Sequence, residues 1–188
     1  MKDSRRSFLL EPPTRPMMAG VAFLRHSRFR LREDYLEKIR RSVGMLDDKQ
    51  IWSRLNWESN SIGNLMLHLA GNLRQWVICG IGGEPDKRER SLEFSANESR
   101  TGVDLLKLVE STIEEADLVL ARLEEESEES EAALKRIIVP QGYSQTVLDA
   151  LFHVVEHFSY HTGQIVMLAK WQKGSALALY DDKELENG

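Results

Sequence analysis

Apolar residues recur every three to four positions in four stretches of this sequence, at about 29–46, 61–81, 102–126 and 145–172. This spacing places them along one side of an α-helix, because a helix turns by about 100° per residue. Few segments show the alternation of apolar and polar residues that marks a half-buried strand. The sequence therefore predicts an all-α fold, a four-helix bundle whose apolar stripes share one core.

The connection between the second and third predicted helices is unusually long, since residues 82–99 are mostly polar. A connection of this length is expected to cross the length of the bundle. Asn60 or Ser61 is placed to cap the second helix, and Thr101 with Asp104 forms a capping pattern before the third.

The predicted fourth helix has apolar residues around most of its circumference. Such a helix is either central in its bundle or lies in an interface between subunits. We therefore expect it to pack against the other three helices and against a second copy of the chain, as a homodimer.

Length and composition indicate one domain, with residues 1–24 as a flexible N-terminal extension, 25–180 as the bundle and 181–188 as a C-terminal tail. Arg5-Arg6 resembles a twin-arginine export signal, but prolines and charges interrupt the apolar region that must follow. The net charge of -5 argues against a nucleic-acid partner. No apolar stretch is long enough for a membrane span, and the single Cys79 suits a reducing compartment, so we expect a cytoplasmic protein.

Histidines supply the clearest chemical pattern. His153, His157 and His161 follow one another at intervals of four residues in the fourth helix. Imidazoles four residues apart can share one ion, whereas those eight apart are separated by about 12 Å along the axis. This helix can therefore supply one of two pairs, His153 with His157 or His157 with His161. His68, beside the apolar stripe of the second helix, is the best third ligand; His26 has no supporting pattern.

A site with three protein ligands leaves coordination positions open for water or substrate, as catalytic sites do. Neutral imidazoles do not compensate the charge of a divalent ion, so such a site favours an anion such as hydroxide or thiolate. The pattern alone also fits histidines that are only hydrogen-bonded in the core. Asn72 and Gln164, each about one turn from a candidate ligand, could position a water or simply link helices.

Two motifs carry a resemblance to a known family: SNSIGNLMLHLAGNLRQW at residues 59–76 and HVVEHFSYHTGQI at 153–165. Together they resemble the DinB/YfiT-like superfamily of metalloenzymes and, within it, a bacterial branch called DUF1572. The resemblance implies a bundle with a long crossover, often dimeric, and a three-histidine site. On this chain the ligands would be His68, His157 and His161.

The resemblance also places His153 one turn before the ligand pair, beside the ligands or in the core. Thr162 departs from the superfamily pattern, which often has arginine after the last ligand. Characterised superfamily members include thiol-dependent transferases and isomerases. The resemblance thus implies a divalent ion (zinc, nickel or iron) that activates a low-molecular-weight thiol for transfer to an electrophile, or water for hydrolysis. The alternative is a non-catalytic metal-binding bundle or a dimeric scaffold of the stress response.

Overall fold

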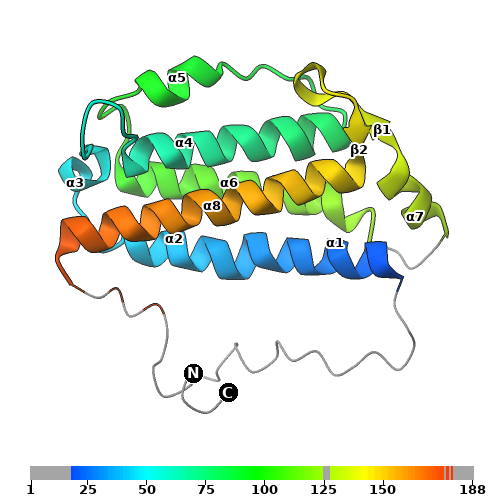
Figure 1. Ribbon diagram of the computed structural model, residues 1–188, viewed down its shortest axis with the longest axis horizontal. Helices are drawn as coiled ribbons and strands as arrows, with labels where there is room; N and C mark the ends of the chain where they lie inside the picture. Colours follow the sequence, from blue (N-terminus) through cyan, green and yellow to red (C-terminus); the bar gives the residue numbers. More distant parts are fainter. Residues whose placement is uncertain (1–17, 125–127, 176, 178, 180–188) are drawn as a thin grey trace, which may run out of the picture.

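The computed structural model describes residues 18–124, 128–175, 177 and 179, and over these residues the chain is an all-α bundle of four long helices (Figure 1). Two of these helices contain a π-helical turn. The long helices are α1 (Ala19–Phe29) continued by η2 (Arg30–Tyr35) and α2 (Leu36–Val43); α4 (Ile62–Leu73) continued by η3 (Arg74–Ile81); α6 (Gly102–Ala121); and α8 (Val147–Lys173).

Shorter elements join the long helices. They are α3 (Asp48–Trp52), α5 (Arg90–Ser95), α7 (Glu128–Lys135), the 3-10 turn η4 (Pro140–Gly142) and the two-residue strands β1 (Ile137–Ile138) and β2 (Gln145–Thr146). The strands pair antiparallel with Ile137 opposite Thr146. The periodicity of the sequence does not predict these elements, because each is too short to show a repeating pattern.

The first long helix begins at Ala19 rather than near residue 29. Residues 19–24, expected in the flexible extension, are therefore helical, and Val21 and Leu24 are fully buried. Ser27 occupies the next core position, so a polar residue interrupts the apolar pattern that would have revealed this helix. The twin arginine and the expected C-terminal tail, 181–188, lie outside the described residues.

The helix starts follow the capping chemistry of the sequence. Ser61 caps α4, since its hydroxyl accepts a hydrogen bond from the Asn64 backbone N–H at 3.1 Å. Thr101 caps α6 in the same way through Asp104 N–H. Both caps were predicted, and each satisfies a backbone donor that the first turn of a helix leaves free.

The long crossover runs back along α4, with α5 lying against that helix (Figure 1). Asn64, a fully buried residue of α4, holds it there by donating from Nδ2 to the carbonyl oxygens of Glu93 and Ala96, both at 2.9 Å. Trp52 Nε1 donates to the Arg100 carbonyl at 2.8 Å. The predicted crossover is confirmed, and side chains of the core fix its path.

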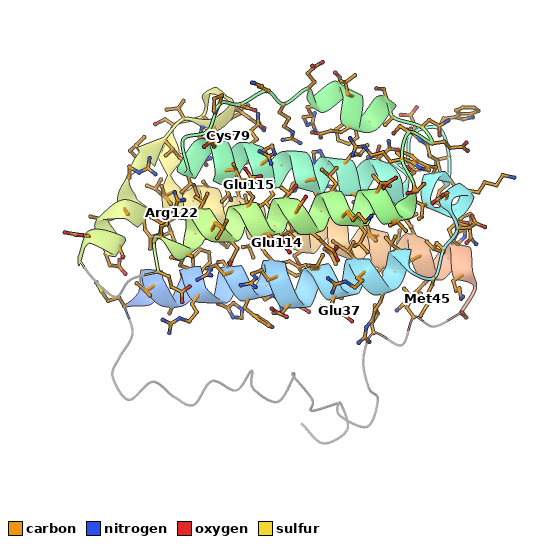
Figure 2. The ribbon with its side chains drawn as sticks, turned by 180° about the vertical axis from the view of Figure 1, so that it is seen from behind. Glu37, Met45, Cys79, Glu114, Glu115 and Arg122 are labelled. Atoms are coloured by element: carbon orange, nitrogen blue, oxygen red, sulfur yellow. The ribbon has the colours of Figure 1, made fainter. Side chains whose placement is uncertain are left out.

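The outer faces of the bundle differ in chemistry. Seen from behind, α6 crosses the middle of the molecule, with Glu114 and Glu115 on its outer side (Figure 2). Ion pairs join α6 to its neighbours, among them Arg40 Nη2 with Glu110 Oε1 at 2.7 Å and Arg74 with Glu115. Within the described residues, the helices all fall short of the length and apolarity that a bilayer crossing requires.

Candidate metal centre

Three histidines from two helices meet between α4 and α8. His157 Nε2 lies 3.0 Å from His68 Nε2 and 3.2 Å from His161 Nε2. Two nitrogens that each bind one zinc ion at about 2.0–2.1 Å are themselves separated by about 3.0–3.4 Å, according to the angle between the bonds. These two separations match adjacent corners of a coordination polyhedron, so the group could hold a metal ion.

His153 takes no part in this group. Its ring lies 4.4 Å from that of Trp76 and 5.5 Å from that of His157, centroid to centroid. The candidate group consists of His68, His157 and His161, whose potential ligand atoms all lie within 4.8 Å of one another. The spacing on the fourth helix had left two pairs open, and the structure brings His157 and His161 together with His68.

His68 is oriented by a carboxylate from the crossover. Its Nδ1 lies 2.8 Å from Oε2 of Glu93, a buried residue of α5. Arg88 Nη2 also lies 3.1 Å from Nδ1. We assign the proton to Nδ1, donating to Glu93, because an ionised carboxylate can only accept. The lone pair on Nε2 is then free and points toward the other two imidazoles.

Glu93 is itself held by a buried arginine. Arg88 donates from Nε to Oε1 at 2.6 Å and from Nη2 to Oε2 at 2.8 Å, a two-pronged contact. Burial raises the pKa of Glu93, but hydrogen bonds from Arg88 and His68 outweigh burial and hold that pKa below its ordinary value. The carboxylate therefore stays ionised, and the arginine balances its charge.

His161 is oriented by its own helix. Its Nδ1 donates to Oε1 of Gln164, one turn further along α8, at 2.6 Å. Gln164 thus holds a candidate ligand in place, whereas the sequence had left open a role in positioning water or in linking helices. Asn72 is buried, and its Oδ1 has no hydrogen-bond partner among the described residues.

The environment keeps the imidazoles on α8 neutral. Burial, followed by the nearby His161 and His68, lowers the pKa of His157 from 6.5 to about 3. Burial also lowers the pKa of His161, against the opposing effect of the Gln164 hydrogen bond. Since a metal ligand must be unprotonated, both residues are in the required state at neutral pH.

Glu93 and Arg88 could not be recognised from the sequence as part of this site. They lie in a connection without periodicity, and Glu93 is 25 residues from His68. One signal was present: a glycine, Gly71, lies inside the second helix three residues after His68. A methyl group at Gly71 would collide with the Glu93 carboxylate and lie 3.0 Å from Arg88 Nε. The glycine lets the ion pair pack directly on α4.

A cavity of about 660 Å³ lies between α4, α6 and the crossover. Its wall includes Arg88 and Glu93 but none of the three histidines. His157 and His161 are half-buried and approach His68 of α4. The cavity thus reaches the carboxylate that orients His68 and not the imidazoles themselves.

These features define a four-helix bundle protein with a candidate three-histidine metal centre between two of its helices. The family described as a protein of unknown function, DUF1572, matches residues 18–179. The match covers most of the chain, so the protein belongs to the DUF1572 family. A search of curated proteins gives no match.

Proposed function

We propose that the protein is a metal-dependent enzyme in which His68, His157 and His161 hold one divalent ion, zinc, nickel or iron. The observation that carries this proposal is the convergence of three Nε2 atoms from two helices. Acceptors on Glu93 and Gln164 hold the Nδ1 hydrogens of two of these rings, leaving their Nε2 lone pairs free. This arrangement is typical of metal-bound histidines.

The charges around the imidazoles favour a reaction with an anionic nucleophile. Arg88 balances Glu93, so the protein provides three neutral ligands and no net negative charge. A bound divalent ion lowers the pKa of a coordinated thiol or water. The proposed reaction is transfer of a low-molecular-weight thiol to an electrophile, with hydrolysis as the second choice. The two histidine motifs resemble those of the DinB/YfiT-like superfamily, whose thiol-dependent members support this order.

A second candidate is a non-catalytic metal-binding scaffold. The contact between His68 and Glu93 favours it, because that hydrogen bond also ties α5 to α4. A purely structural ion would stabilise the fold but would offer no exchangeable position to a thiol or water. Spectroscopy of a cobalt(II) derivative shows whether an added thiol binds to the metal. Binding supports the enzyme, and its absence supports the scaffold.

Metal content tests the proposed site directly. We expect elemental mass spectrometry of untagged protein to find close to one ion per chain. The His157→Ala/His161→Ala variant should contain almost none. His153→Ala is the matched control, since it removes a histidine of the same helix from outside the group, and it should keep the ion. An empty wild type that also takes up no added zinc, nickel or iron would contradict the proposal.

Activity is tested next on the metal-loaded protein. We expect metal-dependent conjugation of a small thiol to model electrophiles, lost in the His157→Ala/His161→Ala variant. If the loaded protein turns over neither a broad panel of thiols nor a panel of esters, the scaffold is the better description.

We also propose that a second copy of the chain covers the outer face of α8. That face exposes Phe152, Tyr160, Met167 and Trp171, which project within about 100° of one another around the helix. The outer face of α6, in contrast, is charged (Figure 2). Phe152 and Met167 lie almost equally far from the middle of α8, so antiparallel pairing of two copies would bring them together. An apolar face of this kind marks an interaction surface.

A further inference from the structure

The interface between the second long helix and α8 contains buried polar atoms that have no hydrogen-bond partner among the described residues. They are Asn72 Oδ1, Trp76 Nε1 and His157 Nδ1. Asn72 is only 3% exposed and Trp76 only 6%. A buried polar group without a partner destabilises the fold, so each such group in a native protein calls for a physical reason.

Asn72 projects toward α8, because the residues one turn before it and one turn after it both contact that helix. The two helices run in opposite directions (Figure 1). His68 Nε2 lies 3.0 Å from His157 Nε2, and the ring of Trp76 lies 4.4 Å from that of His153, centroid to centroid. Residues four apart on a helix project within about 40° of each other. The amide of Asn72 therefore faces the turn of α8 between His153 and His157.

His157 differs from the other two candidate ligands at its outer nitrogen. Nδ1 of His68 donates to Glu93, and Nδ1 of His161 donates to Gln164. Nδ1 of His157 has no partner in the described part of the chain. The orientation and basicity of a metal-bound histidine depend on an acceptor at this nitrogen. The group is therefore complete only if His157 also acquires one.

The position of the His157 hydrogen in the metal-free protein accounts for the unpaired nitrogen. Nε2 of His157 lies 3.0 Å from Nε2 of His68 and 3.2 Å from Nε2 of His161. Both of these neighbours offer lone pairs, because each ring carries its hydrogen on Nδ1. The single hydrogen of the neutral His157 ring is therefore stabilised on Nε2, between two acceptors. Its Nδ1 is then itself an acceptor and has nothing to donate.

We propose that Asn72 is the positioning residue of His157 in the metal-bound protein. His157 can offer the Nε2 lone pair to an ion only if its hydrogen leaves Nε2 and, by exchange with water, Nδ1 takes one up. Nδ1 then becomes a donor, and Oδ1 of Asn72 is the buried acceptor on the facing helix. The ring keeps one hydrogen throughout, so its tautomer changes and its charge does not. This inference rests on the metal site proposed above and adds a residue to it.

Substitutions at Asn72 distinguish an acceptor from a packing group. Asn72→Leu keeps a similar volume without an acceptor, whereas Asn72→Asp keeps an acceptor and adds a charge. We expect competition with a chromophoric chelator to show zinc binding weakened about 10- to 100-fold by Asn72→Leu and retained by Asn72→Asp. Urea denaturation of the metal-free variants should give the opposite order, because an unpaired buried charge destabilises the fold more than leucine does. A packing role predicts the same order in both measurements.

Nuclear magnetic resonance of protein with isotope-labelled histidine nitrogens reads the tautomer of His157 directly. We expect the hydrogen on Nε2 in the metal-free protein and on Nδ1 in the zinc-bound protein. In the zinc-bound state the Nδ1 hydrogen should exchange slowly with water in the wild type and in Asn72→Asp. It should exchange faster in Asn72→Leu, where no acceptor protects it.

Trp76→Phe is the matched control, since it removes another unpaired polar atom of the same interface and keeps an aromatic ring against His153. It should bind zinc as tightly as the wild type. The proposal is overturned if Asn72→Leu binds zinc as tightly as the wild type, or if the Nδ1 hydrogen of His157 exchanges equally fast in both. A wild type that takes up no added zinc, nickel or iron overturns the metal site together with this proposal, so the two failures are distinguishable.

Discussion

Glu93 Oε2 accepts a hydrogen bond of 2.8 Å from Nδ1 of His68, although the two residues lie in different elements, 25 positions apart. The crossover between the second and third long helices is therefore part of the candidate metal centre. Its contribution is to fix which nitrogen of His68 carries the hydrogen and which way the ring faces. Carboxylates that bind the outer nitrogen of a ligating histidine also raise the basicity of that histidine.

Replacing Glu93 by glutamine should weaken zinc binding about 10- to 100-fold, because the neutral amide no longer supports His68. Competition with a chromophoric chelator measures this affinity. Glu89→Gln, an exposed carboxylate of the same segment, is the control and should leave the affinity unchanged. Equal zinc affinity in wild type and Glu93→Gln would show that the carboxylate does not act on the site.

Gly71→Ala should also weaken zinc binding, although Gly71 offers no ligand atom. Its methyl group would displace the Glu93 carboxylate from α4 and so release His68. Gly163→Ala is the matched control, because a methyl group at Gly163 meets no atom within 4 Å. We expect the same chelator competition to report reduced affinity for Gly71→Ala only. Reduced affinity in both variants would point to a general effect on the helices.

Sequence reasoning predicted the elements that leave a local pattern in the sequence. The four long helices, the caps at Ser61 and Thr101 and the crossover followed from local patterns, because apolar spacing and capping depend on neighbours in sequence. The histidine spacing left two pairs of the fourth helix open, and the resemblance to the DinB/YfiT-like superfamily selected His68, His157 and His161.

The remainder depends on contacts between distant residues. Glu93 and Arg88 belong to the site only because the crossover packs on α4, and no local pattern marks that packing. The start of the first helix was missed because Ser27, a polar residue, fills a core position. Arg30 donates to the Tyr35 hydroxyl across a π-helical turn, which the spacing of apolar residues does not reveal.

Asn64→Ala should lower the free energy of unfolding by about 3 kcal/mol, since it leaves several buried polar groups without partners. Asn64 Nδ2 donates to two carbonyl oxygens of the crossover, and its Oδ1 accepts from Ser61 Oγ at 2.7 Å. Urea denaturation followed by circular dichroism measures the change. Asn97→Ala, an exposed asparagine of the crossover, should change the stability little.

The stability of the metal-free protein should depend on pH through His157. Its pKa is lowered from 6.5 to about 3 in the folded protein. Between these values the unfolded chain binds a proton that the folded chain does not, so the free energy of unfolding falls as pH decreases from about 6.5 toward 3. Urea denaturation at pH 7.5 and pH 5, with a chelator present, measures this slope.

His157→Ala removes that contribution and should flatten the dependence of stability on pH. His26→Ala, which removes an exposed histidine remote from the group, should retain the slope of the wild type. If His157→Ala and wild type lose stability equally between pH 7.5 and pH 5, protonation of His157 does not control the effect.

The proposed homodimer is tested on α8. Phe152→Ser/Met167→Ser should shift the protein toward the monomer, because both side chains are more than half exposed in the single chain and would be buried by a second copy. Light scattering after size-exclusion chromatography gives the mass. Leu118→Ser, a similarly exposed apolar residue of α6, should leave the mass unchanged. A wild type that is monomeric at micromolar concentration would remove the dimer from consideration.

His68 and His157 are separated by 89 positions in the chain, and their Nε2 atoms are 3.0 Å apart. An ion that bound both would act as a reversible cross-link, closing a loop of that length. Closing a long loop restricts the unfolded chain more than the folded one. The temperature at which the protein unfolds would therefore rise with the concentration of free metal. The melting temperature would then report metal availability even where no substrate is known.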